Sequence, residues 1–246
     1  MATALITGAS AGLGLEFAWQ LAAAGHELVL VARNVERLET LAAELRAATN
    51  VEVEVLPADL SVRADVDRVA KRLAAIENPV GLLVNNAGYA VNKRFLNSSL
   101  ADQDQSLEVL VRAVMALSHA AGNQMRARGR GAILNVASVA ALTASGTYSA
   151  HKAWVRNFTE GLATELKGTG VTATALCPGF VHTEFHERAK IDYSAFPEFA
   201  WLNPAEVVTT ALADVRRGAV ISTPSLRYRA ASGLLRLLPR PIVRKF

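Results

Sequence analysis

The sequence contains a single cysteine, Cys177, in 246 residues. One cysteine excludes an internal disulfide framework and any metal site built from several cysteines, and no metal site is predicted. A run of about 18 uncharged apolar residues is also missing, so no membrane-spanning helix is expected. The chain does not open on a basic segment followed by an apolar stretch, so a secretory signal is not expected. These absences together predict a reducing, cytoplasmic location.

The segment after Asp214 contains no acidic residue and eight basic residues. The net charge of +4 therefore belongs to the tail, because removing those eight charges leaves −4 for the first 214 residues. The basic residues lack interleaved aromatics and a recognised binding motif, so nucleic-acid binding is not expected. With 51% hydrophobic residues, the chain can bury a core, and its length suits a single domain over residues 1–246.

Short apolar runs alternate with helical patterns along the chain. Strands are predicted at 2–7, 26–32, 51–57, 81–88 (with its turn), 132–138, 171–177 and 219–223. Helices are predicted at 13–24, 35–48, from an N-cap at Ser61 to 76, at 102–126, 148–167 and 204–217. This alternation predicts an α/β fold: a Rossmann-like, doubly wound parallel sheet of about seven strands with helices on both faces.

A glycine-rich string, TGASAGLG, occupies residues 7–14 between the first strand and the first helix. Glycines let the backbone approach a pyrophosphate, and a helix N-terminus supplies free N–H groups and a positive dipole. The string therefore predicts a dinucleotide site, the alternative being a purely structural turn. The residues expected to bind are Gly8, Ser10, Gly12, Leu13 and Gly14.

The second strand ends in Val31-Ala32-Arg33-Asn34, with no acidic residue. An acid there would bond the adenosine ribose and repel a 2′-phosphate, whereas Arg33 can face that phosphate with a planar, charged fork. NADP(H) is therefore predicted as the cofactor, with NAD(H) disfavoured. The alternative is a surface arginine paired with Glu36.

Tyr148 and Lys152 are four residues apart at the start of a predicted helix, so their side chains share a face. At an effective dielectric of about 20, an ammonium about 4 Å away favours the phenolate by on the order of 4 kcal/mol. Tyr148 can then act as an acid/base near neutral pH. The alternative is a surface pair on an amphipathic helix. Ser138 ends the fifth strand, but it lacks the G-x-S-x-G turn of a serine hydrolase.

These motifs resemble those of the short-chain dehydrogenase/reductase family, in the family's order, over nearly all of residues 1–223. The resemblance rests on TGASAGLG, Asp59-Leu60, NNAG (85–88), Ser138, YSAHK (148–152) and PGFVHT (178–183). It implies an oxidoreductase that interconverts a ketone and a secondary alcohol by hydride transfer. Ser138, Tyr148 and Lys152 would be the catalytic residues.

The resemblance also implies the other cofactor contacts. Asp59 and the Leu60 amide would meet the adenine, although Asp59 could also begin the next helix cap. Tyr148 and Lys152 would hold the nicotinamide ribose. Further contacts would come from the turns after the fourth and sixth strands: Asn86, Ala87, Gly88, Pro178, Gly179, Val181 and Thr183.

Two features depart from the family pattern. Leu110 stands where the family usually has an asparagine that holds a water beside the lysine, so a catalytic triad is expected and turnover could be slow. Only ten positions separate Ser138 from Tyr148. The shortened loop is expected to line the substrate pocket with small, apolar residues: Ala140, Ala141, Leu142, Thr143 and Ala144.

Residues 184–203 correspond to the family's mobile lid. Its aromatic residues suggest a hydrophobic carbonyl substrate such as a fatty-acyl compound, or simply pack the lid onto the body. The aromatic residues of the lid are Phe185, Tyr193, Phe196, Phe199 and Trp201, and Phe180 lies shortly before it.

The tail, 226–246, has the pattern of a basic amphipathic helix. Its apolar face comprises Leu226, Ala230, Leu234, Leu237 and Leu238, with Arg227, Arg229 and Arg236 largely elsewhere. Such a helix can lie on an anionic membrane, but packing against the body or another subunit is favoured.

Small residues on the helices at 102–126 and 148–167 suit a homodimer, or a homotetramer, built by helix packing. They are Ala113, Ala116, Ala120 and Ala153. The competing hypothesis to an enzyme is a nucleotide-sensing or scaffold protein of the same fold. Leu110 favours that alternative, whereas the intact Ser138, Tyr148 and Lys152 oppose it.

Overall fold

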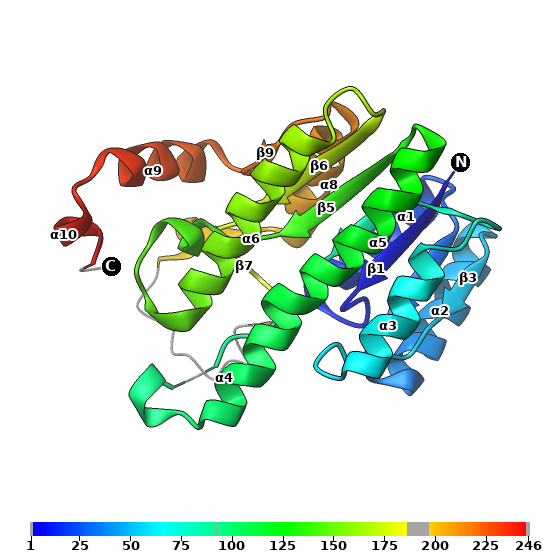
Figure 1. The fold of residues 1–246 in the computed structure, drawn as a ribbon, viewed down its shortest axis with the longest axis horizontal. Coiled ribbons are helices and arrows are strands. Elements are labelled where there is room, and N and C mark those ends of the chain that lie inside the picture. Colours follow the sequence, from blue (N-terminus) through cyan, green and yellow to red (C-terminus); the bar gives the residue numbers. More distant parts are fainter. Residues whose placement is uncertain (1, 92, 186–196, 245–246) are drawn as a thin grey trace.

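The computed structural model describes residues 2–91, 93–185 and 197–244. Seven parallel strands form its central sheet in the order β3-β2-β1-β4-β5-β6-β9 (Figure 1). The strands are β1 (Thr3–Thr7), β2 (Leu28–Val31), β3 (Val53–Val55), β4 (Val80–Asn85), β5 (Gly131–Val136), β6 (Val171–Leu176) and β9 (Ile221–Ser222). The predicted doubly wound α/β fold is confirmed.

Helices cover both faces of this sheet. They are α1 (Gly12–Ala23), α2 (Val35–Thr49), α3 (Arg63–Leu73), α5 (Ala113–Arg128), α6 (Gly146–Glu165) and α8 (Pro204–Arg216). A further helix, α4 (Leu100–Leu107), precedes α5 and contributes no residue to the cores against the sheet. One core lies between the sheet and α1, α2 and α8, and a second lies beneath α3 and α5. Neighbouring β1 residues serve opposite cores: Ile6 packs in the first and Leu5 in the second. Burial on both faces explains why these strands are continuously apolar.

The third helix begins later than predicted, and the N-cap prediction at Ser61 is wrong. Val62 is the residue before α3, and no side chain caps the helix there. The Ser61 hydroxyl instead donates to Asp59 Oδ1 at 2.7 Å. This bond directs the Ser61 side chain to Asp59, in the turn that precedes the helix.

The long helix predicted at 102–126 is interrupted by a π-helical turn, η2 (Glu108–Arg112), between α4 and α5. Leu110 lies in the middle of this turn and is buried. π-helical turns are rare and often occur at functional sites. This one places Leu110 beside the residues described below.

A two-stranded sheet outside the central one was not predicted. β7 (Phe180–Val181) pairs in parallel with β8 (Trp201–Leu202). This pairing joins the segment just before the predicted lid to the last residues of that lid. Tyr193 and Phe196 lie outside the described residues. The described residues also include three short 3-10 turns: η1 (Phe95–Asn97), η3 (Val139–Leu142) and η4 (Glu198–Ala200).

The tail forms α9 (Leu226–Leu237) and α10 (Arg240–Val243), which lie at one edge of the molecule (Figure 1). Leu226, Leu234 and Leu237 are 78%, 59% and 84% exposed. The exposure of these leucines contradicts packing of the apolar face against the body, whereas packing against another subunit stays a prediction. A different face of α9 contacts the body. Leu238 lies beyond the helix, where the backbone turns extended before Pro239.

Candidate active site

A cavity of about 1350 Å³ opens at the carboxyl ends of β1, β4, β5 and β6. This edge is where parallel α/β sheets bind ligands, because the strand order reverses between β1 and β4. Of the predicted site residues, only Gly14 is not part of the lining. Those that line the cavity are Gly8, Ser10, Gly12, Leu13, Arg33, Asp59, Leu60, Asn86, Ala87, Gly88, Ser138, Tyr148, Lys152, Pro178, Gly179, Val181 and Thr183.

The glycine turn has the geometry that an anionic ligand requires. Gly8 and Gly12 have φ of +66° and +56°, a region that other residues rarely adopt. No side chain caps the N-terminus of α1, so its first N–H groups stay available on the cavity side. A pyrophosphate would suit these donors and the helix dipole. The residues present therefore fit a dinucleotide.

Asn86 and Thr7 join the turn after β4 to the glycine turn. The Asn86 Nδ2 group donates to the carbonyl oxygens of Thr7 at 2.9 Å and Gly8 at 3.3 Å. The Thr7 hydroxyl accepts from the backbone N–H groups of Asn86 and Ala87, both at 3.0 Å. The Asn86 side chain thus braces the cavity floor, a role that sequence reasoning missed.

Arg33 lies beside Asp59, and not paired with Glu36. Its Nη1 atom is 3.9 Å from Asp59 Oδ2, and the Arg33 side chain is 70% exposed. Burial tends to raise the pKa of Asp59, but hydrogen bonds from Ser61 and the charge of Arg33 bring that pKa below its ordinary value. Asp59 therefore stays ionised. The Arg33 guanidinium lies at the edge of the cavity, and most of its N–H donors have no partner among the described residues.

Ser138 follows β5 and precedes the turn η3. Its Oγ accepts from the Ala140 backbone N–H at 3.1 Å. This bond orients the side chain and leaves the hydroxyl proton as a donor. Phe185, from the predicted lid, lies across the cavity with its ring centre 6.0 Å from that of Tyr148.

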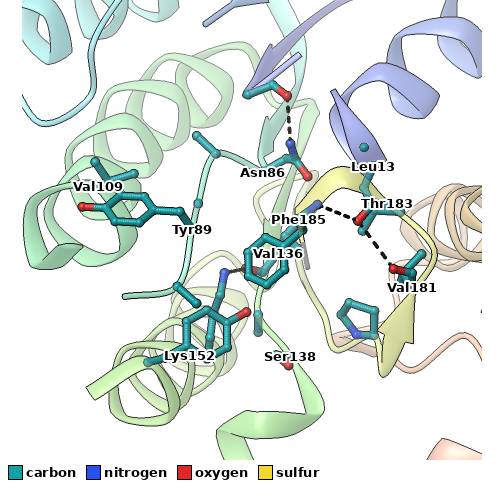
Figure 2. Close-up of a pocket in the computed structure, with 18 of the residues that line it drawn as sticks. Leu13, Asn86, Tyr89, Val109, Val136, Ser138, Lys152, Val181, Thr183 and Phe185 are labelled. Carbon is teal, nitrogen blue, oxygen red and sulfur yellow. Dashed lines mark hydrogen bonds between the residues drawn. The ribbon is translucent and has the colours of Figure 1, made fainter. Parts of the chain in front are cut away.

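Lys152 is buried, and its Nζ donates to the Val136 carbonyl at 2.7 Å (Figure 2). The same atom lies 5.8 Å from the centre of the Tyr148 ring. Burial lowers the pKa of Lys152 to about 8. The ammonium thus persists at neutral pH, close enough to favour a phenolate. Tyr148 is also the third residue of α6, where the helix dipole acts in the same direction.

Leu110, at the sequence position where the resemblance implies an asparagine, lies beside Gly88 and near Lys152. A Cβ built on Gly88 would lie 2.8 Å from Leu110 Cδ2 and 3.7 Å from Lys152 Nζ. The leucine therefore packs against the Gly88 backbone next to the ammonium. The Leu110 side chain cannot accept a hydrogen bond from Lys152. The Lys152 ammonium donates to the Val136 carbonyl instead.

The loop after Ser138 lines the cavity differently from the prediction. Only Ala140 and Thr143 of the five predicted residues face it, together with Val139 and Ser145. The Thr143 hydroxyl lies 3.0 Å from that of Ser149, which anchors the loop to α6. The lining is therefore more polar than expected.

Some of the predicted lid aromatics line the cavity, where a substrate could bind, and others pack against the body of the protein. Phe180 packs on Trp201 with ring centres 5.6 Å apart, and the Trp201 ring also stacks on His182. Phe199 is 68% exposed. Of the aromatic residues predicted in or next to the lid, Phe180 and Phe185 line the cavity. Packing accounts for the position of Trp201.

Three polar side chains that line the cavity, from Arg37, Tyr89 and Tyr228, are among those that sequence reasoning missed. Arg37 lies in the first turn of α2 and lines the cavity with Arg33. Its Nη1 atom is 3.3 Å from Glu184 Oε2. Tyr89 has a buried hydroxyl without a hydrogen-bond partner among the described residues. Tyr228 comes from α9, far away in the sequence. The four-residue spacing from Arg33 could have identified Arg37, but no local pattern marks Tyr228.

Among the described residues, no histidine is hydrogen-bonded to Ser138, so the described part of the chain forms no hydrolytic triad there. His182 contacts Glu198 at 2.9 Å and His151 lies 3.5 Å from Ser106. In the described part of the chain, no cluster of three or more His, Cys, Asp or Glu side chains could hold a metal ion. The described helices also include none that is long and apolar enough to span a membrane.

The family model for short chain dehydrogenase matches residues 2–194. Gluconate 5-dehydrogenase from Gluconobacter oxydans is 38% identical over 199 residues, which cover 78% of this chain and 75% of that protein.

Two solved structures are similar over almost their full length. A short-chain dehydrogenase from Sphingobium yanoikuyae, in complex with NADPH, is 35% identical with a TM-score of 0.88; the match covers 98% of this chain and 97% of that one. The bulky-bulky ketone specific alcohol dehydrogenase from Comamonas testosteroni is 31% identical with a TM-score of 0.83, over 98% and 96%.

Proposed function

Because the chain belongs to the short-chain dehydrogenase family, we propose that it is an NADP(H)-dependent oxidoreductase that interconverts a ketone and a secondary alcohol. One observation carries this proposal: Ser138, Tyr148 and Lys152 line the same cavity as an uncapped glycine turn. A hydride donor and a carbonyl could therefore meet beside a proton donor.

In the proposed reduction, bound NADPH supplies the hydride. The Ser138 hydroxyl donates to the carbonyl oxygen and holds the substrate beside Tyr148. The Tyr148 phenol gives its proton to that oxygen as the alcohol forms, and solvent later restores the proton. The Lys152 ammonium stabilises the phenolate that remains. Because Leu110 stands in the family's asparagine position, no side-chain amide there holds a water beside Lys152. The proton that restores Tyr148 must therefore reach the cavity by another route.

We propose that Arg33 selects the 2′-phosphate of NADP(H), with Arg37 as a second positive charge at the same end of the cavity. The NADPH complex of the Sphingobium relative supports this choice. Arg33→Ala should weaken NADPH binding about tenfold or more, because charge-assisted hydrogen bonds are lost. NADH binding should hardly change.

Fluorescence titration with each nucleotide measures this difference. Arg63→Ala is a matched control, since Arg63 is exposed on α3 and pairs with Asp67 outside the cavity. An equal loss of affinity for NADPH and NADH in Arg33→Ala would contradict the assignment.

The substrate proposed is a hydrophobic ketone, such as a fatty-acyl compound. Phe180, Phe185 and Leu235 contribute apolar lining near Ser138 and Tyr148. The similarity to an alcohol dehydrogenase specific for bulky ketones is in keeping with this class. A panel of aliphatic, aromatic and polar ketones, followed by NADPH consumption, tests the proposal. Tight NADPH binding without turnover of any member would favour a nucleotide-sensing protein.

The rate of reduction should fall as pH rises above about 8, where Lys152 loses its proton. Below that pH the ammonium is present and favours the proton transfer from Tyr148; above it the neutral amine does not. A kcat/KM profile from neutral to alkaline pH measures the decline. Thermal unfolding at each pH controls for loss of structure. A rate that rises through this range would be inconsistent with the assigned role.

We also propose a homodimer or homotetramer built on α5 and α6. Ala113, also predicted for this contact, is instead buried in the core beneath α5. Ala116, Ala120 and Ala153 are only partly buried on these helices, and Met115 is 44% exposed. Small residues allow two helices to approach closely.

A further inference from the structure

The helix α9 has one face against the cavity and another without a described partner. On the inner face, the Tyr228 hydroxyl accepts from the Phe180 N–H at 3.2 Å and donates to the Ala200 carbonyl at 2.7 Å. The Tyr228 ring occupies the space beside Gly179, where a Cβ would lie 2.0 Å from it. Leu235 lines the cavity and Ser232 is buried. These contacts fix the orientation of the helix.

The outer face presents an apolar stripe. Leu226, Leu234 and Leu237 are well exposed, and Ala230 and Gly233 complete the stripe between them. The spacing of four, three or one residues keeps all five on one side of an α-helix. Exposed leucines at this density cost free energy in water, so a covering partner is expected.

Arginines border the stripe on both sides. At 100° per residue, Arg227 lies on one side of the stripe, and Arg229 and Arg236 lie on the other. Arg227 also donates to the Phe199 carbonyl, which places the exposed Phe199 near the start of the helix. The chain after Asp214 contains no acidic residue.

We propose that the outer face of α9 docks on the surface of an anionic lipid bilayer. The leucines would enter the boundary between headgroups and acyl chains, while the arginines meet lipid phosphates. A second copy fits this face less well. A two-fold contact through α9 would bring two sets of arginines together with no acid on either helix.

The docking would also place the cavity near the lipid. An α-helix with side chains is about 10 Å across, so its outer face and the cavity lining on its inner face are separated by one helix diameter. If the proposed hydrophobic substrate is correct, it could pass between the bilayer and the cavity. The docking itself does not depend on that substrate.

Sedimentation of the full-length protein with vesicles tests the proposal. Phosphatidylglycerol/phosphatidylcholine vesicles should bind the protein at low salt, and pure phosphatidylcholine vesicles should bind it at least tenfold more weakly. Leu234→Gln/Leu237→Gln should reduce binding to the anionic vesicles about tenfold or more. Leu96→Gln/Leu100→Gln, at exposed leucines outside α9, is the matched control and should bind like the unchanged protein.

Failure of the unchanged protein to bind anionic vesicles would overturn the proposal, as would equal binding by the α9 double variant. A smaller solution mass of the α9 variant, combined with no vesicle binding by the unchanged protein, would assign the face to a second copy instead. Circular dichroism and NADPH titration of each variant separate these results from misfolding and from an error in the proposed reaction.

Discussion

Replacing Tyr148 by phenylalanine should lower kcat for ketone reduction by about 10²–10⁴-fold, the usual contribution of a general acid. The substitution removes one hydroxyl and keeps the ring that packs near Phe185. The proton that the carbonyl oxygen needs would then have to come from water. NADPH affinity should change little, because the glycine turn and Arg33 are untouched. Steady-state kinetics and nucleotide titration measure the two effects separately.

Tyr89→Phe is a matched control for this prediction. Tyr89 lines the same cavity, and its hydroxyl has no hydrogen-bond partner among the described residues. Its removal should therefore leave turnover nearly unchanged. If Tyr148→Phe retained most of its activity, or if both variants lost activity equally, Tyr148 would not be the proton donor.

The second large effect is expected from Gly14→Ala. A Cβ at Gly14 would lie 2.2 Å from the Gly8 carbonyl oxygen and 2.5 Å from Asn86 Nδ2. Both neighbours belong to the braced cavity floor, so the turn itself must move. Overpacking of this kind costs about 1–3 kcal/mol, which corresponds to a fall in Tm of roughly 2–12 °C for a chain of this length. NADPH affinity should fall as well, because the displaced Gly8 belongs to the cavity lining.

Gly161→Ala gives the opposite expectation. Gly161 lies within α6, and no atom lies within 4 Å of its would-be Cβ. Alanine is the better helix former by about 1 kcal/mol, so Tm should rise slightly and NADPH binding should persist. Calorimetry of both variants checks the prediction. A Gly14→Ala protein as stable as the unchanged one would mean that the glycine turn is not tightly packed against Asn86.

The fold was predictable because its signals are local. Continuous apolar runs such as Leu28–Val31 mark strands buried on both faces, and stripes such as Leu38, Leu41 and Leu45 mark helices. The gathering of site residues was also predictable. Residues that follow different parallel strands, such as Gly8, Asn86 and Ser138, must meet at one edge of the sheet.

The side-chain partners were less predictable, because they depend on which acceptors folding brings near. Ser61 bonds Asp59 rather than a helix end, and Arg33 lies beside Asp59 rather than Glu36. The Val136 carbonyl, sixteen residues before Lys152, receives the lysine ammonium. Nothing in the spacing of these residues specifies the bond.

The amino-acid sequence alone thus determined the order of the main strands and helices, the glycine turn and most of the predicted residues that line the cavity. Those properties follow from the periodicity of apolar residues and from the backbone freedom of glycine at positions such as Gly8 and Gly12. Tertiary structure alone decided which face of α9 is covered. Its apolar stripe was visible in the sequence, but Tyr228 beside Gly179 turns that stripe outward. Close packing between distant segments selects one orientation among several that an amphipathic pattern allows.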